Sequence, residues 1–295
     1  MATFAPSGPI VLTTGQTITG LHITSDSGPC IQGSNVSNVH IHDNRIGPCG
    51  DGNQGNGVAV ENVSGLTVDN NHFEDVASAL YAVGTGNGDS NIVFERNLAI
   101  KVRGPMPRGQ MVQFNHIDGP GHRIECNVSD QAIGGYGEGP EDHVNMFASN
   151  GTEASPIMIR HNRLRGGGSK SGGGIVGGDA GGSYVTVQSN ILVDAGQYGI
   201  AVASGHHIRL LSNTIYAQQN AWTNVGCFIW LQYDGIACYG NEIRGNRVNY
   251  TNKNGEQNPF WNAGNCGEVE GLADNSFPDS SVTAAIWDGP FDDCP

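Results

Sequence analysis

The chain has 295 residues and a formal net charge of −14, from 14 basic and 28 acidic side chains. A nucleic-acid-binding protein would need a basic stripe, and a membrane-spanning helix would need about 20 consecutive apolar residues. The sequence has neither, so we expect no nucleic-acid partner and no membrane span. Its 45 glycines and its low share of charged residues, 14%, favour many short strands joined by tight turns.

The N-terminal residues 1–10 lack the charged head and the apolar stretch of a secretory signal. Either the protein is cytosolic or a signal peptide has been removed. The acidic composition favours a secreted or periplasmic location.

The seven cysteines are an odd number. Cys30 and Cys49 each follow Gly-Pro, one repeat apart. One arrangement has three bridges and one buried thiol: Cys30–Cys49, Cys227–Cys238, Cys266–Cys294 and free Cys126. The alternative is seven reduced thiols, and the outcome would indicate the redox compartment.

Eight segments share the pattern apolar-x-x-Asn, usually followed by a further apolar residue. Their asparagines are 27, 26, 30, 35, 28, 23 and 33 residues apart. The segments are Ile41–Ile46, Val68–Phe73, Phe94–Asn97, Ile124–Val128, Ile159–Leu164, Val187–Leu192, Leu210–Ile215 and Ile243–Val248. This spacing exceeds a hairpin and is too irregular for a helical repeat. It fits a coil of three short strands and three turns, with insertions at some turns.

An asparagine at the same corner of every coil has a physical reason. Asparagine tolerates left-handed backbone, and its amide can bond to the coils above and below. Stacked amides then form a ladder, and stability sums over contacts between neighbouring coils. A β-sandwich is the alternative, but its strands would alternate every 8 to 12 residues without a fixed asparagine corner.

These coils resemble the right-handed β-helix repeats of the pectate-lyase-like superfamily over about residues 20–250. The resemblance implies an all-β fold, a right-handed single-stranded parallel β-helix with about eight or more coils. We expect it to occupy residues 1–250, with a C-terminal capping segment at 251–295. The superfamily includes polysaccharide lyases, uronan C5-epimerases, glycoside hydrolases and phage tailspikes, so the repeat predicts the fold rather than the chemistry.

A second strand is predicted before each asparagine corner. The segments are Val58–Val60, Leu80–Val83, Met111–Phe114, His143–Met146, Gly174–Val176, Gly199–Val202 and Phe228–Leu231. Strand side chains alternate in direction, so the inward set would be Val112, Phe114, Val144 and Met146. The outward set would be Gln113, Asn115, His143 and Asn145. Small residues in neighbouring coils would leave a groove with a polar centre, typical of a polysaccharide site.

Three insertions enter coils at this level: residues 100–109, 132–143 and 166–174. Loops that lengthen one wall of a solenoid usually build its binding cleft. We expect these to bring to the groove Lys101, Arg103, Tyr136, Glu138, Glu141, Asp142 and Lys170.

Glu141, Asp142 and His143 form the densest ionisable cluster. A carboxylate beside an imidazole can orient it and raise its basicity. In a different order, the cluster resembles the Asp-Pro-His-Glu signature of β-helix uronan epimerases. We therefore expect a lyase or epimerase acting on a long, acidic polysaccharide, with His143 as the base.

The other catalytic groups would follow from this chemistry. Tyr136 would donate a proton and Asp142 would orient His143. Lys101 and Arg103 would stabilise the charge that develops beside the uronate carboxylate. The substrate-binding set would be Gln113, Asn115, Asn145, Glu138, Glu141, Lys170 and Trp230. Trp230, with Tyr233 and Trp222 nearby, would stack on sugar rings or pack beneath the C-terminal tail.

Other functions remain open. A glycoside hydrolase would use two carboxylates drawn from Glu138, Glu141, Asp142 and Asp179. A non-catalytic glycan-binding or adhesion protein would use the same groove without chemistry. Asp142 and Asp179 are also candidate ligands for a Ca²⁺ cofactor.

Overall fold

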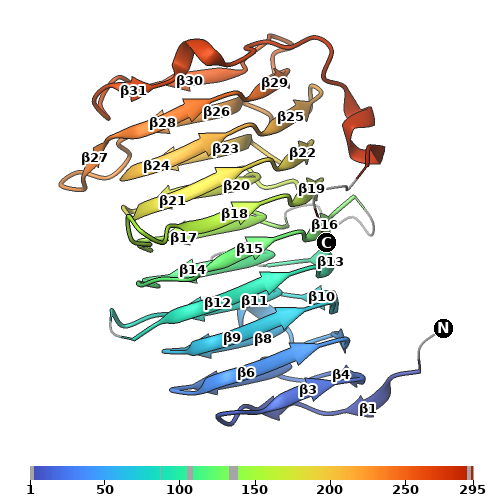
Figure 1. Cartoon of the computed structure of the whole chain (residues 1–295). Coiled ribbons are helices and arrows are strands. Elements are labelled where there is room, and N and C mark those ends of the chain that lie inside the picture. The colour runs from blue at the N-terminus through green and yellow to red at the C-terminus, as the bar shows by residue number, and fades with distance from the viewer. Residues whose placement is uncertain (1–2, 87, 105–108, 133–138, 291–293, 295) are drawn as a thin grey trace.

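The computed structural model describes residues 3–86, 88–104, 109–132, 139–290 and 294. Over these residues the chain forms a right-handed parallel β-helix with three sheets of ten, ten and eleven strands. The coils stack from the N-terminal strands to the C-terminal strands in one elongated body (Figure 1). The predicted fold class is confirmed.

Each coil contributes one strand to each sheet. The first sheet contains β1 (Ala5–Ser7), β4 (Leu21–Ile23), β7 (Arg45–Ile46), β10 (His72–Val76), β13 (Leu98–Val102), β16 (Val128–Asp130), β19 (Arg163–Arg165), β22 (Ile191–Val193), β25 (Thr214–Ala217) and β29 (Arg247–Tyr250). The second contains β2 (Ile10–Val11), β5 (Ile31–Ser34), β8 (Val58–Glu61), β11 (Leu80–Val83), β14 (Val112–Asn115), β17 (Val144–Phe147), β20 (Ile175–Asp179), β23 (Tyr198–Ala203), β26 (Val225–Trp230) and β30 (Phe260–Asn262). The third contains β3 (Thr17–Thr19), β6 (Ser37–His42), β9 (Ser64–Asp69), β12 (Ser90–Glu95), β15 (Arg123–Glu125), β18 (Ile157–Arg160), β21 (Ser183–Gln188), β24 (Gly205–Leu211), β28 (Asn241–Arg244) and β31 (Val269–Glu270). The eleventh strand of the third sheet, β27 (Cys238–Tyr239), pairs with β24. The described residues also form the short 3-10 helices η1 (Gly52–Gln54), η2 (Leu272–Asp274) and η3 (Ala284–Asp288).

The predicted second strands all lie in the second sheet, as β8, β11, β14, β17, β20, β23 and β26. Their inward side chains join one core that runs the length of the solenoid. The third sheet shows the same stacking in its inward column, where Phe94, Ile124 and Ile159 occupy successive coils and are fully buried. Each such side chain contributes roughly 1.5–3 kcal/mol by leaving water.

The predicted asparagine ladder is confirmed and forms the corner between the third and first sheets. The Asn162 amide donates to Asn190 Oδ1 at 2.9 Å and to the Ile124 carbonyl at 2.9 Å. Its own Oδ1 accepts from the Asn127 side-chain amide and backbone N–H, at 2.9 and 3.1 Å. The same side-chain bond joins Asn44 through every predicted asparagine to Asn246, and then on to Asn275.

The left-handed backbone at this corner belongs to the residue before each asparagine, not to the asparagine itself. Asp43, Arg96, Cys126 and His161, for example, have φ between 52° and 59°. The asparagine side chain can therefore point inward. There its amide forms hydrogen bonds with backbone N–H and C=O groups at the turn that would otherwise be buried without partners.

The coils continue beyond residue 250, where we expected the cap to begin. β30 and β31 extend two sheets to Glu270, Asn275 then adds a further corner to the ladder, and Ser276 forms a parallel bridge with Arg247. The final segment crosses the last coil and descends beside the first sheet, where η3 packs on β22 and β25 (Figure 1). There Trp287 lies under the Arg165 guanidinium, 4.3 Å from its ring centroid.

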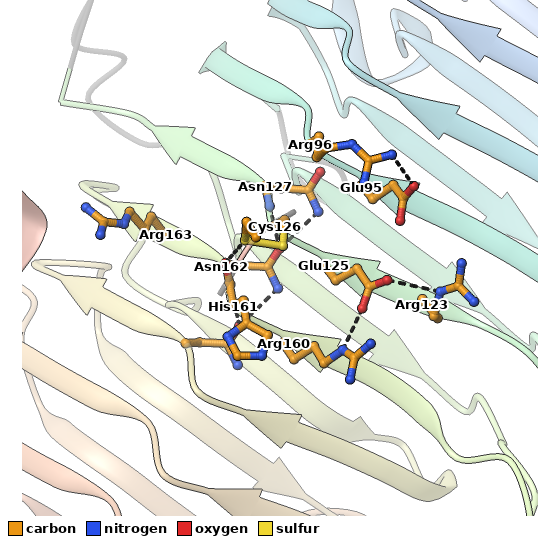
Figure 2. Close-up of a disulfide and its surroundings, with 12 residues drawn as sticks. Glu95, Arg96, Arg123, Glu125, Cys126, Asn127, Arg160, His161, Asn162 and Arg163 are labelled. Atoms are coloured by element: carbon orange, nitrogen blue, oxygen red, sulfur yellow. Dashed lines mark hydrogen bonds and ion pairs between the residues drawn. A yellow bond between two sulfur atoms is a disulfide. The ribbon is translucent and has the colours of Figure 1, made fainter. Parts of the chain in front are cut away.

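A disulfide and a buried arginine hold this final segment in place. Cys126 bonds to Cys294, and the Arg163 guanidinium donates to the backbone carbonyls of Trp287, Gly289 and Pro290. Figure 2 shows the disulfide beside the ladder asparagines Asn127 and Asn162.

The cysteine pairing differs in part from the predicted arrangement. Cys30–Cys49 is confirmed, but the other bridges are Cys126–Cys294 and Cys238–Cys266, and Cys227 is the free thiol. Cys227 is a fully buried inward residue of β26 in the second sheet, whereas Cys238 lies in the third sheet and bonds to Cys266. Cys126 is not a free packing residue because the left-handed corner lets its sulfur reach the final segment.

None of the helices in the described ranges has the length and apolar character needed to cross a bilayer.

The ladder predicts a large effect of one substitution. Asn162→Ala removes the acceptor for the Asn127 backbone N–H and side-chain amide, and the side-chain donor to the Ile124 carbonyl. Because these groups are buried, we expect the free energy of unfolding to fall by at least about 2 kcal/mol. Denaturant unfolding of Asn162→Ala and of the exposed Asn254→Ala measures this. Asn254→Ala should stay within about 0.5 kcal/mol of the parent. Equal losses in both variants would contradict a structural ladder.

The disulfides predict a thiol count. Alkylation of the denatured, unreduced protein should modify one cysteine, Cys227, and peptide mass spectrometry identifies it. The folded protein should resist alkylation because burial raises the pKa of the Cys227 thiol to about 12. Modification of Cys126 or Cys294 before reduction would contradict the assigned pairing.

Candidate functional site

The outer face of the second sheet carries two rows of side chains that run across the coils. One row passes through Gln113 and Asn145, which are paired in register. The other passes through Asn115, Phe147, Asp179 and then Trp230. The predicted outward direction of Gln113, Asn115 and Asn145 is confirmed, although Gln113 and Asn145 are almost buried.

A pocket of about 310 Å³ lies on this face over the C-terminal coils. Its walls combine three carboxylates with several aromatic rings. The residues that line it are Glu141, Asp142, Ser171, Val176, Asp179, Gln197, Tyr198, Ala203, Asn224, Val225, Phe228, Trp230, Gln232, Tyr233 and Trp261. None of these described lining residues is a lysine or an arginine.

Asp142 is the most buried ionisable group of the pocket, with 3% of its surface exposed. Its Oδ1 accepts from the Tyr198 hydroxyl at 2.5 Å and the Gly173 N–H at 2.9 Å. Its Oδ2 accepts from the Asn145 amide at 2.9 Å. Burial outweighs these donors and raises the pKa of Asp142 to about 6. The carboxyl is therefore partly protonated near neutral pH.

Asp179 is linked to Asp142 through one amide. The Asn145 nitrogen donates to Asp142 Oδ2 at 2.9 Å and to Asp179 Oδ2 at 3.0 Å. Because both oxygens contact the same nitrogen, they lie within about 6 Å of each other. The Tyr233 hydroxyl holds the other Asp179 oxygen at 2.9 Å. Two carboxylates thus meet in one pocket, each held by a tyrosine.

A bulge in β20 sets the direction of Asp179. Val176 pairs with Asn145, but Asp179 pairs with Phe147, so β20 has one residue more than β17 at this point. Without the extra residue the alternation would turn Asp179 into the core. Glycine is needed at the bulge because a Cβ at Gly178 would lie 2.4 Å from the Ser204 carbonyl oxygen.

The glycine-rich insertion, residues 166–174, packs against Asp142 and donates a backbone hydrogen bond to it. A Cβ at Gly172 would lie 1.8 Å from the Glu141 carbonyl oxygen, and one at Gly173 would meet the Tyr198 backbone at 2.3 Å. This close approach lets the Gly173 N–H reach Asp142. The glycines of this insertion therefore allow the loop to pack closely against the site.

Aromatic rings line the pocket on its C-terminal side, beginning two strands beyond Asp179. Trp230 and Trp261 are 36% and 45% exposed and meet edge to face, with centroids 5.9 Å apart. Phe228 packs edge to face on Tyr198 and tilts against Trp261. Exposed indoles beside polar groups are suited to stacking on sugar rings. Trp230, which was expected at the groove, lines this pocket.

His143 is not on the outer face, contrary to the expectation. It is fully buried, with Nδ1 2.8 Å from Ser129 Oγ and Nε2 2.7 Å from the Gly166 carbonyl oxygen. The residue precedes β17 at the corner where the chain enters the second sheet, so its ring turns towards the first sheet. Burial lowers the pKa of His143 to about 4. The imidazole is neutral and both its nitrogens are engaged.

Lys101 and Arg103 do not reach the pocket either. Lys101 belongs to β13 of the first sheet, and its Nζ donates to Glu74 at 2.7 Å. The Arg103 guanidinium bonds to Asp75 and to the carbonyls of Cys49 and Gly50 in earlier coils. Both were expected to face the groove, but Lys101 lies in β13 and Arg103 directly follows it, so both belong to the first sheet and not to the second.

The remaining expected residues have varied positions. Glu141 lines the pocket, and its Oε2 accepts from Gln110 at 3.1 Å. Asn115 donates to the Tyr81 hydroxyl at 3.1 Å, outside the pocket. Lys170 is exposed and precedes the lining residue Ser171. Tyr136 and Glu138 lie outside the described residues.

The calcium hypothesis gains no support. Within the described ranges, no group of three histidine, cysteine, aspartate or glutamate side chains is arranged to hold a metal ion. An amide N–H₂ group lies between Asp142 and Asp179, where a cation would need an oxygen ligand.

Sequence patterns missed Tyr198 and Trp261. Tyr198 is 56 residues from Asp142, and nothing in its own segment indicates the contact. Trp261 was assigned to the tail, but it is a strand residue in register with Phe228. A ninth repeat, Leu272-Ala-Asp-Asn275-Ser-Phe277, would have placed Trp261 in the last coil.

Comparison with known proteins supports the fold and goes no further. A family model described as a right-handed beta helix region matches residues 7–103, about a third of the chain. No curated protein and no solved structure gives a significant match.

Proposed function

We propose that the chain is a carbohydrate-active enzyme that hydrolyses glycosidic bonds of a polysaccharide in the pocket around Asp142 and Asp179. One observation carries the proposal. A buried carboxyl with a raised pKa lies within about 6 Å of a second carboxylate, in a pocket walled by exposed indoles. Glycoside hydrolysis uses two carboxyl groups in different protonation states.

Asp142 is the general acid in this proposal. Its pKa of about 6 keeps a proton available to the leaving oxygen as the C1–O bond breaks. Asp179 attacks C1 to form a glycosyl ester. A water molecule, losing its proton to the Asp142 carboxylate, then releases the sugar and restores both groups. The upper limit of about 6 Å between the two Oδ2 atoms is below the roughly 6.5–9.5 Å of inverting enzymes and compatible with the roughly 5–5.5 Å of enzymes that retain configuration.

A long substrate fits the outer face of the second sheet. A second pocket of about 430 Å³ lies on the same face over the N-terminal coils, lined by Ala59, Tyr81 and Val83 among others. Tyr81 and Gln113 occupy one row with Asn145. A chain of sugars long enough to reach both pockets would lie along this face, above the buried Gln113 and Asn145.

The lyase and epimerase alternative is weaker on chemical grounds. That reaction needs a base on the sugar and a cation beside the uronate carboxylate. The candidate base, His143, is buried with both nitrogens bonded, and the described lining residues include no lysine or arginine. Hydrolysis requires neither group.

We also propose that the chain is a distant relative of the pectate-lyase-like proteins and acts in a secreted or periplasmic setting. The repeat supports the first statement. The three disulfides support the second, because such bonds persist in oxidising compartments.

Hydrolysis should depend on Asp142 and on pH. With a panel of polysaccharides, reducing ends should appear without the ultraviolet absorbance of an unsaturated sugar. Asp142→Asn should lower kcat by about 10²–10⁴-fold, whereas Asp26→Asn, an exposed carboxylate in the second coil, should be neutral. Because the acid must be protonated, kcat should fall as pH rises through about 6. Unsaturated products would contradict hydrolysis.

The carboxylate spacing predicts the stereochemistry. The first product released should keep the anomeric configuration of the substrate, which proton NMR during early turnover can measure. Asp179→Asn should abolish turnover and the glycosyl ester together. An inverted first product would exclude Asp179 as the nucleophile and would require a more distant second carboxylate.

A further inference from the structure

We infer that the pocket over the N-terminal coils is a second, non-catalytic site that binds uncharged sugar units. The inference goes beyond hydrolysis at Asp142, because this site would bind its ligand even in a protein that cleaves nothing. It follows from a buried amide without a partner, from the side chains around that amide, and from the strand register that joins the two pockets.

Asn56 lines the N-terminal pocket, and only 1% of its surface is exposed. Its Oδ1 atom has no hydrogen-bond partner in the described structure. The ladder amides differ, since Asn162 Oδ1, for example, accepts two hydrogen bonds. A buried polar atom without a partner destabilises the free protein, and a ligand hydroxyl that donates to it would remove that cost. Asn56 is therefore a binding residue in this inference, with no part in the ladder.

The backbone around Asn56 is fixed on both sides. The Asn56 carbonyl accepts from the Cys30 N–H at 2.9 Å, and the Asn56 N–H donates to the Gln54 carbonyl at 2.8 Å. Cys30 is held in turn by its disulfide. A Cβ at Gly55 would lie 1.7 Å from the Gly50 carbonyl oxygen, so the turn before Asn56 is closely packed. The pocket is therefore formed before a ligand arrives, which lowers the entropic cost of binding.

The polar side chains of the pocket favour an uncharged ligand. Gln32 and Gln54 add two amides to that of Asn56, and an amide can both donate to and accept from hydroxyl groups. Glu61 is the only carboxylate among the described lining residues, and none of them is a lysine, arginine or histidine. An anion would meet no cation here, and a cation would meet one exposed carboxylate screened by water. Hydroxyl groups need neither charge.

An apolar floor lies beside these amides. Val11, Gln32, Ala59 and Tyr81 occupy successive strands of one row on the outer face, and Val11 is 67% exposed. The Tyr81 hydroxyl accepts from Asn115 at 3.1 Å, which orients its ring. A sugar ring presents hydroxyls at its edge and C–H groups on its faces, so amides beside an apolar floor are complementary to it.

The strand register places the two pockets on one face at a defined separation. β8, which contributes Ala59 and Glu61 to the N-terminal pocket, lies five strand steps from β23, which contributes Tyr198 to the other. At the usual strand spacing this is about 24 Å. With one carboxylate, the N-terminal pocket lacks the pair that hydrolysis needs. It can hold a neutral stretch of polymer while the chemistry takes place elsewhere.

The test uses β-1,4-linked trisaccharides of glucose, mannose, galactose and xylose, with trigalacturonate as the charged comparison. The protein carries Asp142→Asn, so that no ligand is cleaved. Calorimetry measures binding in both pockets. None of the four tryptophans is among the described residues of the N-terminal pocket, so binding there should leave indole fluorescence unchanged. We expect at least one neutral trisaccharide to bind silently in this sense, with a millimolar Kd or lower, and trigalacturonate at least about tenfold more weakly.

Two further substitutions assign the silent binding to this pocket. Asn56→Ala should raise its Kd by about tenfold and leave the denaturant midpoint unchanged or higher, because an amide without a partner is removed. Ala59→Arg should abolish it by filling the floor. The exposed Asn254→Ala should change neither the Kd nor the midpoint.

The outcomes keep this inference separate from the proposed hydrolysis. Silent binding in a protein that yields no product from any polysaccharide would support the second site and contradict the hydrolase. Binding that always changes indole fluorescence, or none at all, would overturn the second site and leave the hydrolase in place. An unchanged Kd or a lower midpoint in Asn56→Ala would show that Asn56 is not a binding residue. Equal or tighter binding of trigalacturonate would exclude a preference for uncharged sugars.

Discussion

The hydrogen bond between ladder asparagines is the interaction on which the rest of the molecule depends. Each one fixes the height of one coil on the next, since an amide such as that of Asn162 bonds to coils on both sides. This vertical register places Asn145 beside Val176 and, one bulge later, Asp179 beside Phe147. The two carboxylates of the site, 37 positions apart in the sequence, become neighbours only because successive coils are held at strand spacing.

The fold could be predicted from the sequence because its determinants are local and repeated. Eight successive coils each carry an asparagine, inward apolar residues and a turn, so eight copies reinforce one interpretation. The outer face could be predicted to the same extent: Gln113, Asn115 and Asn145 obey the alternation of β14 and β17. These residues lie in regular strands, where period two leaves little freedom.

The site could be predicted less well because its residues lie where regularity ends. His143 occupies a corner, where alternation does not apply, and it turned out to be buried. Lys101 is near the end of β13 and Arg103 directly follows it, and their partners Glu74 and Asp75 belong to an earlier coil. The double glycine before Asp179 was visible, and glycine within a strand often marks a bulge. The outward direction that the bulge gives to Asp179 could not be predicted without the register of β20 against both neighbouring strands.

The bond between Cys126 and Cys294 has a consequence for how the solenoid comes apart. A linear array of coils normally frays from its ends, since an end coil has a neighbour on one side only. Here a crosslink across 168 residues joins the chain terminus to the middle of the array, and the final segment lies along the flank between them. The last coils therefore cannot peel away in sequence while the bond is intact. The C-terminal half of the molecule, which carries the pocket, is therefore expected to unfold as one unit. The N-terminal coils are expected to unfold first.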